Sequence, residues 1–567
     1  MSKKIVVIGG VAGGASAAAR IRRLDEQAEI IMFEKGPYVS FSNCCLPFHL
    51  SGTVAKASDL VLMSPEQFKN QYNIIAKVNH EVLHIDRQAK QVEVKEETTG
   101  KIYTEAYDEL VLSPGANAVM PKSIIGIDKP HVFSVRNVPD IAKIKEFVDG
   151  NDIKEITVVG GGFIGLEVAE NLRMDNKKVA LVEAANQVMM PFDYDMAQIL
   201  HKELMDQGIE LVLEDSVKEI TDTDVLLASG KKIAAGAVVM AIGVRPETAL
   251  ATDCGLEIGE TGGIKVNHHY KTSDPAIYAV GDAIEVTHRI TQKKTRLTLA
   301  GPAQRQARAA ADHIYGRTYV NTGVIGSSVV RVFQFNAACT GLNEKDCQKA
   351  GIAYQTAMVI PKDKVGLMPD ARPLFFKLIF ADPSGKILGA QAVGEGNVDK
   401  RVDVIATMIS MGGTLEDLKE LELCYSPDFG TAKDVVNMAA LVGLNVLNGE
   451  YKQVPLTQIR ELVEKNAYIV DAREPKEFAE GHIVNAVNIP LSEFRQRLDE
   501  IPTDQPVYVH CLSSQRSYNM VRALGNLGFT NVYNLMGSFL GLSMYEYFND
   551  QTKGRKPIVT NYRFDLL

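Results

Sequence analysis

The pattern of apolar and polar stretches predicts two similar strand–helix–strand units. Residues 4–10 (KIVVIGG) are apolar and lead into a glycine-rich turn, an alanine-rich stretch and a second apolar run at residues 29–35. Residues 155–184 repeat this order. A short apolar run bounded by turn residues is typical of a buried parallel strand. We therefore expect a βαβ unit at residues 4–35 and a second at residues 155–184.

The remaining pattern predicts further strands and at least two more folding units. Residues 53–120 alternate strand-like runs with polar turns, and the runs at 238–243 (VVMAIG) and 276–281 (AIYAVG) predict two more strands. A helix is expected at residues 299–314. From about residue 326 a mixed α+β segment runs to residue 448, and the pattern changes again after residue 455.

Glycines at the turns of the two βαβ units indicate what kind of ligand these units bind. Gly160, Gly162 and Gly165 complete a G-x-G-x-x-G pattern, whereas Val11 replaces the second glycine of the first turn. Close backbone approach and free N–H groups at a helix N-terminus suit a pyrophosphate. Glu34 and Glu183 end the second strands, where a carboxylate can accept hydrogen bonds from ribose hydroxyls. Both units are therefore interpreted as dinucleotide-binding; the alternative is an ordinary glycine-rich turn.

Composition narrows the class of protein. The 567 residues carry a net charge of −9, which argues against a general nucleic-acid surface. The seven cysteines are sparse, odd in number and without C-x-x-C spacing, which favours a reducing compartment over a disulfide framework. Residues 1–4 lead directly into a strand, and no apolar run reaches the ~20 residues of a membrane span. We expect a cytoplasmic protein without a signal peptide.

Two adjacent cysteines, Cys44 and Cys45, follow the first unit. The surrounding S-F-S-N-C-C-L-P at residues 40–47 resembles the sequence around the single redox cysteine of the coenzyme A-disulfide reductases, a branch of the FAD-dependent pyridine nucleotide-disulfide reductases. By motif position Cys44 is the catalytic thiol. The family usually has a small residue where this chain has Cys45, so the role of Cys45 stays open, and two buried structural cysteines are the alternative.

The resemblance implies two cofactors. Those expected to bind FAD are Gly9, Gly10, Ala12, Gly13, Gly14, Glu34, Lys35, Asp282 and Ala283. Those expected to bind NADH are Gly160, Gly162, Gly165, Glu183 and Gly243. Glu183 would repel the 2′-phosphate of NADPH, and Ala184 to Asn186 offer no arginine to bind it, so NADH is favoured.

It also implies a coenzyme A site. The expected ligands are Ser16, Arg20, Arg23, Ser40, Asn43, Gln304, Arg305 and Lys433. Tyr425 is expected to act in catalysis, reaching the site together with Lys433 across a dimer interface. Arg20 and Arg23 share a helix face, for which a solvated basic surface is the alternative. Met368 replaces a second family tyrosine, which predicts an altered substrate preference.

The C-terminal segment resembles a rhodanese domain. Residues 471–483 (DAREPKEFAEGHI) match its D-x-R-x-x-x-E-F-x-x-G-H-I pattern, and Cys511 begins a C-x-x-x-x-R loop that ends at Arg516. The helix N-terminus and loop N–H groups would stabilise a Cys511 thiolate or persulfide. Asp471 and Arg473 are expected to brace the loop through ion pairing. The six-residue loop suits sulfur transfer better than the alternative, oxyanion chemistry on larger groups.

We therefore expect an α/β protein with two Rossmann-like nucleotide-binding domains, an α+β dimerisation domain and a C-terminal α/β rhodanese domain. The expected ranges are 1–120 with 245–325 for FAD, 121–244 for NAD(P)H, 326–448 for dimerisation, 449–455 for a linker and 456–567 for the rhodanese domain.

The parts together predict a homodimeric NADH-dependent flavoenzyme that reduces coenzyme A persulfide or disulfide, or related persulfides and polysulfides, and releases hydrogen sulfide and thiol. No metal, nucleic acid or membrane partner is expected. One alternative is an NADH oxidase or peroxidase that cycles through a cysteine sulfenic acid. That branch carries a histidine in the first glycine loop, where this chain has Ala12. The other is a non-catalytic flavin redox sensor.

Overall fold

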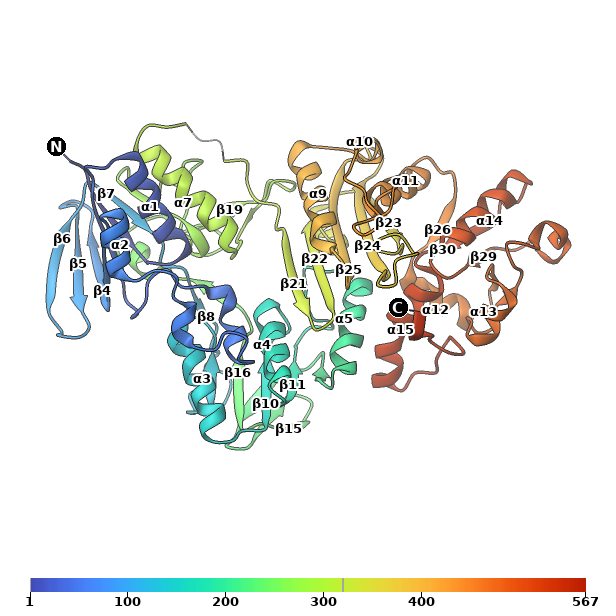
Figure 1. Ribbon diagram of the computed structural model, residues 1–567, viewed down its shortest axis with the longest axis horizontal. Coiled ribbons are helices and arrows are strands. Elements are labelled where there is room, and N and C mark those ends of the chain that lie inside the picture. Colours follow the sequence, from blue (N-terminus) through green and yellow to red (C-terminus); the bar gives the residue numbers. More distant parts are fainter. Residues whose placement is uncertain (1, 319–320, 567) are drawn as a thin grey trace. The chain divides into compact units, whose positions relative to one another are not determined.

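Both predicted βαβ units are present in the computed structural model, which describes residues 2–318 and 321–566 (Figure 1). The chain divides into two units, one formed by residues 1–184 with 215–324 and the other by residues 185–214 with 325–567. Each unit is described by itself below. The short apolar runs of the sequence form the strand cores, since Ile5, Val6 and Val7 are fully buried.

The first unit contains two parallel sheets. The first has the order β18–β7–β1–β2–β3 and consists of β18 (Ile277–Ala279), β7 (Glu109–Leu112), β1 (Lys4–Ile8), β2 (Glu29–Glu34) and β3 (Ile75–Val78). The second has the order β11–β10–β16–β9 in this unit and consists of β11 (Lys178–Val182), β10 (Glu155–Val159), β16 (Ala237–Met240) and β9 (Val132–Ser134).

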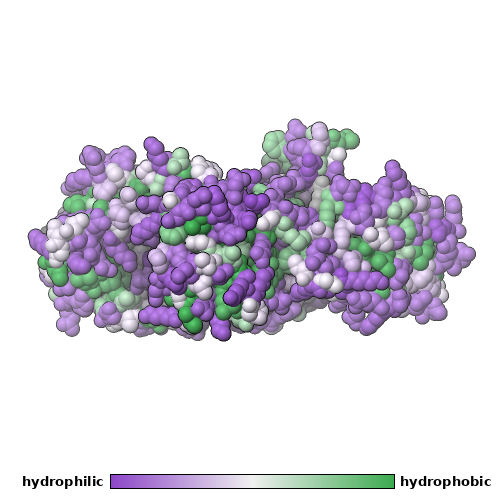
Figure 2. All heavy atoms as spheres, turned by 90° about the horizontal axis from the view of Figure 1, so that it is seen from below, coloured by the Kyte–Doolittle hydropathy of each residue, from purple (hydrophilic) through white to green (hydrophobic). Residues whose placement is uncertain are grey.

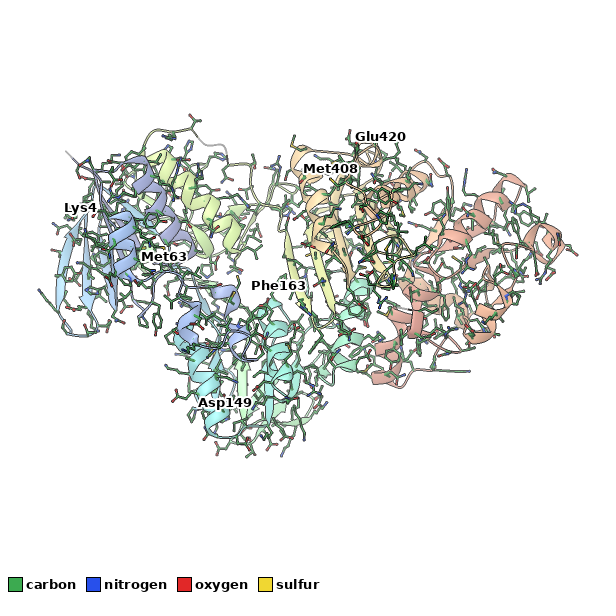
Figure 3. The ribbon with its side chains drawn as sticks, viewed as in Figure 1. Lys4, Met63, Asp149, Phe163, Met408 and Glu420 are labelled. Carbon is green, nitrogen blue, oxygen red and sulfur yellow. The ribbon has the colours of Figure 1, made fainter. Side chains whose placement is uncertain are left out.

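Helices and smaller sheets complete the first unit. Its helices are α1 (Ala12–Leu24), α2 (Pro65–Tyr72), α3 (Val138–Gly150), α4 (Phe163–Met174), α6 (Ala249–Asp253) and α7 (Ala300–Ile314). Its antiparallel pairings are β4 (His80–Asp86), β5 (Gln91–Glu96) and β6 (Ile102–Ala106); β13 (Val217–Ile220), β14 (Asp224–Leu227) and β15 (Lys232–Ala234); β8 (Ala116–Ala118) with β17 (Val244–Pro246); and β19 (Val286–Thr287) with β20 (Lys294–Thr295). In Figure 3, Lys4 marks the start of β1, the first strand of the first βαβ unit. Phe163 marks the start of α4, the helix of the second βαβ unit.

The second unit begins with an antiparallel sheet, as the mixed pattern after residue 326 predicts. Its order is β21–β22–β25–β24–β23, formed by β21 (Ser328–Val332), β22 (Phe335–Gly341), β25 (Ile387–Gly394), β24 (Leu374–Ala381) and β23 (Tyr354–Val359). Its helices are α8 (Glu344–Ala350), α9 (Val398–Met411), α10 (Leu415–Lys419) and α11 (Val435–Leu447).

A parallel sheet follows in the same unit, with the order β26–β30–β29–β27–β28. Its strands are β26 (Lys452–Val454), β30 (Val532–Leu535), β29 (Val507–His510), β27 (Tyr468–Asp471) and β28 (Val487–Asn488), and its helices are α12 (Leu456–Glu464), α13 (Pro475–Glu480), α14 (Gln515–Asn526) and α15 (Ser538–Lys553). The expectation of a linker at residues 449–455 is wrong for residues 452–454. They form an edge strand, and three residues are too few to show an alternating pattern.

One helix of the second unit comes from the middle of the chain. α5 (Tyr194–Asp206), followed by β12 (Glu210–Val212), packs against α15 and β25. Tyr194 hydrogen-bonds Asn549 of α15, and the His201 ring lies 4.9 Å from that of Phe548 between centroids. The segment that the sequence assigns to the NAD(P)H domain thus folds partly with the C-terminal unit.

Buried charges hold the start of α5. The Lys377 ammonium, on β24, lies 2.8 Å from Asp195 and 3.1 Å from Asp193, and it also pairs with Glu344. Burial alone would lower the pKa of Lys377, but the three carboxylates raise it above its usual value. The three carboxylates are close enough to bind a metal ion, but the ammonium of Lys377 already pairs with all three.

Figure 2 shows hydrophilic side chains over much of the face drawn, with apolar ones in small groups between them. Among residues 2–318 and 321–566, no helix has both the length and the apolar character needed to span a membrane.

Candidate functional site

The two glycine turns place uncapped helix N-termini at the ends of parallel strands. Neither Val11, which precedes α1, nor Gly162, which precedes α4, makes a side-chain capping bond, and the first turn of each helix has no acidic residue. By contrast, α2 begins with a capping box. Free N–H groups and the positive end of the helix dipole fit a pyrophosphate.

Glycine is required where each helix crosses its turn. A Cβ on Gly14 would lie 1.8 Å from the carbonyl oxygen of Gly9, and a Cβ on Gly165 would lie 1.8 Å from that of Gly160. Gly9 and Gly160 also have φ of +94° and +110°, a region that side chains disfavour. Val11, which stands at the second glycine position of the pattern, does not disturb this packing. Both turns therefore have a geometry that suits a dinucleotide.

Two carboxylates lie beside these turns. Glu34 accepts hydrogen bonds from the N–H groups of Gly10 and Gly36, both at 2.9 Å. Glu183 accepts one from the N–H of Gly161 at 2.7 Å. Their positions support the predicted ribose contacts, and Glu183 supports the prediction that NADH is preferred.

Asp282 lies in the short 3-10 turn that follows β18. Burial raises the pKa of Asp282 to about 6, although the charge of Arg136 lowers it. The N–H of Gly281 donates to Gln306 of α7 at 2.7 Å, which ties this turn to the helix. Asp282 is thus a partly desolvated acceptor, suited to ligand hydroxyl groups.

Cys44 and Cys45 lie in the 3-10 turn Asn43–Cys45, where Cys44 is exposed and Cys45 is half-buried. Successive side chains of a 3-10 turn point about 120° apart. The two thiols therefore face different directions, which supports Cys44 as the thiol open to a substrate.

The electrostatic surroundings of Cys44 bring distant segments together. Desolvation raises the pKa of Cys44, and smaller contributions come from Glu167 of α4, from Cys45 and from Asp282. The loop after Cys44 is fixed to α4, because the Ser51 hydroxyl donates to Asn171 at 2.7 Å. The cysteine turn, α4 and the Asp282 turn thus share one region of the first unit.

Glu167 was not among the residues expected from the sequence. Burial and, to a smaller extent, the charge of the neighbouring Glu170 together raise the pKa of Glu167 to about 7. At neutral pH this carboxyl is partly protonated beside a thiol. Its only signal in the sequence is a charged residue two positions after Gly165, inside an otherwise apolar helix start.

The predicted coenzyme A ligands fall in both units. On α1, Arg23 is exposed, but Arg20 donates from Nε to Asp312 of α7 at 2.7 Å. In the first unit Asn43, Gln304 and Arg305 are exposed, and Ser16 and Ser40 are half-buried. Lys433 and Tyr425 belong to the second unit and are exposed, Tyr425 by 50%. The ligand assignments stay predictions, and Arg20 would have to share or release Asp312.

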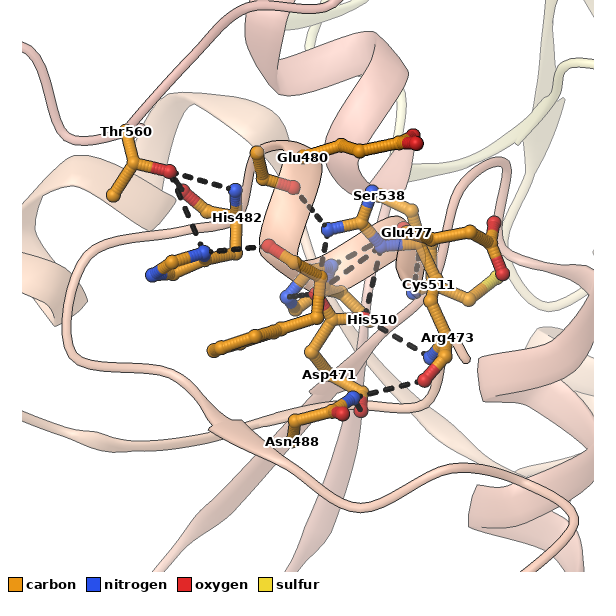
Figure 4. A network of polar contacts seen from close by, with 12 residues as sticks. Asp471, Arg473, Glu477, Glu480, His482, Asn488, His510, Cys511, Ser538 and Thr560 are labelled. Atoms are coloured by element: carbon orange, nitrogen blue, oxygen red, sulfur yellow. Dashed lines mark hydrogen bonds and ion pairs between the residues drawn. The ribbon is translucent and has the colours of Figure 1, made fainter. Parts of the chain in front are cut away.

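Cys511 follows β29 at the start of the loop that leads into α14, and its side chain is buried. Its N–H donates to the Ser538 hydroxyl at 3.2 Å (Figure 4). The Ser517 hydroxyl lies 3.6 Å from its Sγ. The loop reverses at Ser514, which has φ of +74°. The thiol thus lies at the N-terminal end of α14, where an anion is stabilised.

Ion pairs surround this loop, as predicted for Asp471 and Arg473. Arg473 donates to both oxygens of Asp471, at 2.6–3.1 Å, and to the carbonyl of Gly481 (Figure 4). Arg516 makes a two-point ion pair with Glu477 of α13, at 2.6 and 2.7 Å. Ser538 of α15 was missed, since only folding brings it to the loop. Ser517, next to the loop in α14, and Glu477, a position of the rhodanese pattern, were given no role from the sequence.

Known proteins share both halves of this arrangement. A family described as pyridine nucleotide-disulphide oxidoreductase matches residues 3–307, its dimerisation domain matches residues 327–434 and a rhodanese-like domain matches residues 456–544. The coenzyme A disulfide reductase of Staphylococcus haemolyticus is 32% identical over 437 residues, which are 77% of this chain and 98% of that protein.

Two solved structures extend the likeness to the C-terminal segment. The reduced CoADR-RHD of Bacillus anthracis is 44% identical, with a TM-score of 0.93 over 97% of this chain and 99% of that one. The NAD-dependent persulfide reductase from A. fulgidus is 34% identical, with a TM-score of 0.90 over 94% and 99%. The chain therefore belongs to the pyridine nucleotide-disulphide oxidoreductase family and carries a rhodanese-like domain at its C-terminus.

Proposed function

We propose that this protein is an NADH-dependent reductase of coenzyme A persulfide or disulfide and of related persulfides and polysulfides. The observation that carries the proposal is the presence in one chain of two different thiol sites. Cys44 lies beside the dinucleotide-binding unit, and Cys511 lies in a sulfurtransferase-type loop. The net reaction is coenzyme A persulfide + NADH + H⁺ → coenzyme A + hydrogen sulfide + NAD⁺.

The residues present fit both cofactors. The uncapped start of α1 with Glu34 and Asp282 would hold FAD, and the uncapped start of α4 with Glu183 would hold NADH. FAD, when bound, supplies the two-electron redox chemistry between nicotinamide and sulfur. The chain's own contribution is to orient these groups and to present Cys44.

Cys44 is proposed to form a mixed disulfide with coenzyme A, or to carry a persulfide. A thiolate attacks a disulfide sulfur. Because the pKa of Cys44 is raised, Cys44 must lose its proton before it can attack the substrate. No C-x-x-x-x-C pair precedes it in the sequence, so the coenzyme A thiol serves as the second sulfur. Exposure of Cys44 permits this exchange.

Coenzyme A is proposed to be held through its phosphates by Arg23 and Lys433, which are exposed cations, and by Arg20 after exchange with Asp312. The match to a dimerisation domain supports a homodimer. In this homodimer, Tyr425 and Lys433 are proposed to serve the partner's site. All seven cysteines are free thiols, which supports a cytoplasmic location.

The direct test replaces Cys44 by Ser. We expect NADH-dependent reduction of coenzyme A disulfide and persulfide to be lost while FAD stays bound, because the flavin-holding residues are elsewhere. NADH consumption and the flavin spectrum measure the two properties. Cys45→Ser is the matched control and should keep most turnover. Near-normal turnover in Cys44→Ser with loss in Cys45→Ser would reassign the catalytic thiol.

The rival reading is an NADH oxidase. The water-forming NADH oxidase of Lactobacillus brevis is 27% identical, with a TM-score of 0.75, but its likeness covers 79% of this chain. A water-forming oxidase would consume one oxygen molecule for every two NADH molecules without any sulfur substrate. We expect this protein to consume oxygen slowly, and added persulfide to divert the electrons of NADH from oxygen to sulfur.

A further inference from the structure

Two arginines lie near the Cys511 loop, but each is paired with a carboxylate, so they do not make the loop positively charged. The pKa of Arg516 is raised first by its hydrogen bond to Glu477 and, among smaller causes, by the charge of Cys511, so the guanidinium is close to the thiol. Both of its terminal nitrogens, however, are bound to the Glu477 carboxylate. A two-point pair of this kind leaves little of the cation for a ligand.

The second arginine is committed in the same way. Arg473 is buried, binds both oxygens of Asp471 and rests on the Phe539 ring at 4.2 Å from its centroid. His510, next to Cys511, is also buried, and burial lowers its pKa, so it is neutral at pH 7. The formal charges of Arg516, Glu477, Arg473, Asp471 and neutral His510 therefore sum to zero. Of the two acids, Asp471 is buried and Glu477 is half-exposed.

Sulfur donors differ in the charge that such a site must accommodate. Transfer from thiosulfate, S₂O₃²⁻ + Cys511–S⁻ → SO₃²⁻ + Cys511–S–S⁻, brings in a dianion and releases one. Transfer from a persulfide, R–S–S⁻ + Cys511–S⁻ → R–S⁻ + Cys511–S–S⁻, brings in a donor with one negative charge on its sulfur atoms and releases a thiolate with one. Thiosulfate carries one more negative charge than the persulfide, both as donor and as leaving group, so its reaction depends more strongly on a free cation near Cys511.

We infer that Glu477 is a specificity-determining residue: by occupying Arg516 it selects persulfide donors and excludes dianionic donors such as thiosulfate. The inference rests on the sulfur-transfer role proposed for Cys511 and adds which donor that thiol accepts. Glu477 acts through Arg516, so it is a positioning residue and takes no part in bond making.

The experiment uses the full-length flavoprotein without NADH, so that sulfur bound to Cys511 is not consumed. The protein is mixed with thiosulfate or with cysteine persulfide, and the mass of the Cys511 peptide is followed with time. In the unmodified protein the rate constant with persulfide should exceed that with thiosulfate by at least about 100-fold. In Glu477→Gln the thiosulfate rate should rise by about tenfold or more, with the persulfide rate changed by less than about threefold.

Two variants control for a structural role. Glu480→Gln removes another α13 carboxylate, one that pairs with Arg563 instead of Arg516, and should change neither rate. Glu477→Asp keeps the charge and should keep thiosulfate excluded. Equal loss with both donors in Glu477→Gln would show that the ion pair only supports the loop and would overturn the inference. So would a natural preference for thiosulfate, which needs no variant to measure. Failure of Cys511 to accept sulfur from either donor would instead overturn the role of Cys511 itself.

Discussion

At the scale of single residues, the position of Glu183 makes nucleotide choice a question of charge. A 2′-phosphate beside this carboxylate would place like charges together in a partly desolvated site, at a cost of about 1–3 kcal/mol, or ~5- to 150-fold in selectivity. Glu183→Ala should therefore narrow the preference for NADH over NADPH. Because Glu183 also holds the Gly161 N–H, both nucleotides should bind more weakly, and the ratio of their kcat/KM values is the measurement. A natural preference for NADPH would contradict the interpretation.

Glu167 predicts a pH-dependent effect on Cys44. Burial raises the pKa of Glu167 to about 7, so this carboxyl is neutral well below pH 7 and negative above it. Its negative charge disfavours the Cys44 thiolate. Glu167→Gln should therefore speed alkylation of Cys44 by iodoacetamide severalfold at pH 8 and have little effect at pH 5.5.

That measurement is best made in a Cys45→Ser background, so that one thiol in the turn reacts. Glu146→Gln removes an exposed carboxylate of α3 in the same unit and is the matched control. An equal effect of Glu167→Gln at both pH values would mean that the glutamine changes the shape of the site and not its charge.

Sequence patterns identify residues whose role is local. Gly9, Gly160 and Cys511 lie in short motifs whose spacing sets their geometry, and the structure gives them the expected turns. Glu477 is a fixed position of the D-x-R-x-x-x-E-F-x-x-G-H-I pattern, but the pattern does not show that it pairs with Arg516. Glu167 acts on Cys44, which lies far away in the chain, so no spacing reveals it. The same holds for Asp312, which lies almost 300 residues from Arg20.

At the scale of elements, the buried charges at the start of α5 predict a large stability effect. Lys377→Met would leave Asp193 and Asp195 buried without their cation, and breaking a buried ion pair in this way costs about 3–5 kcal/mol. Urea unfolding followed by circular dichroism should show an earlier transition for the second unit. Lys386→Met, an exposed position before β25, should shift it by less than about 0.5 kcal/mol.

The elements themselves were largely predictable, but their grouping was not. Both βαβ units and the helix at residues 299–314 follow directly from apolar runs bounded by glycine. The docking of α5 on α15 depends on contacts such as Tyr194 with Asn549, between segments that sequence order assigns to different domains. β26 was missed because a short edge strand carries too few residues to show a period.

At the scale of the whole molecule, the two thiols should divide the work. If Cys511 collects sulfane sulfur and Cys44 delivers electrons to it, Cys511→Ser should abolish sulfur transfer from polysulfide yet leave NADH-dependent reduction of preformed coenzyme A persulfide largely intact. NADH oxidation with each substrate measures the two activities. Equal loss of both would indicate that sulfur must pass through Cys511 before any reduction.

The path of the chain between the two units has a practical consequence. The backbone passes from one unit to the other after residues 184, 214 and 324. A protease that cuts once after residue 324 would therefore produce two polypeptides. α5 would belong to the N-terminal polypeptide but would stay folded in the second unit, which the C-terminal polypeptide mainly forms. The nicked enzyme should elute as a single particle on gel filtration and separate into two bands only in denaturant. Because residues 185–214 interrupt the first unit, a truncation at either end of the gene cannot yield the first unit without this segment of the second.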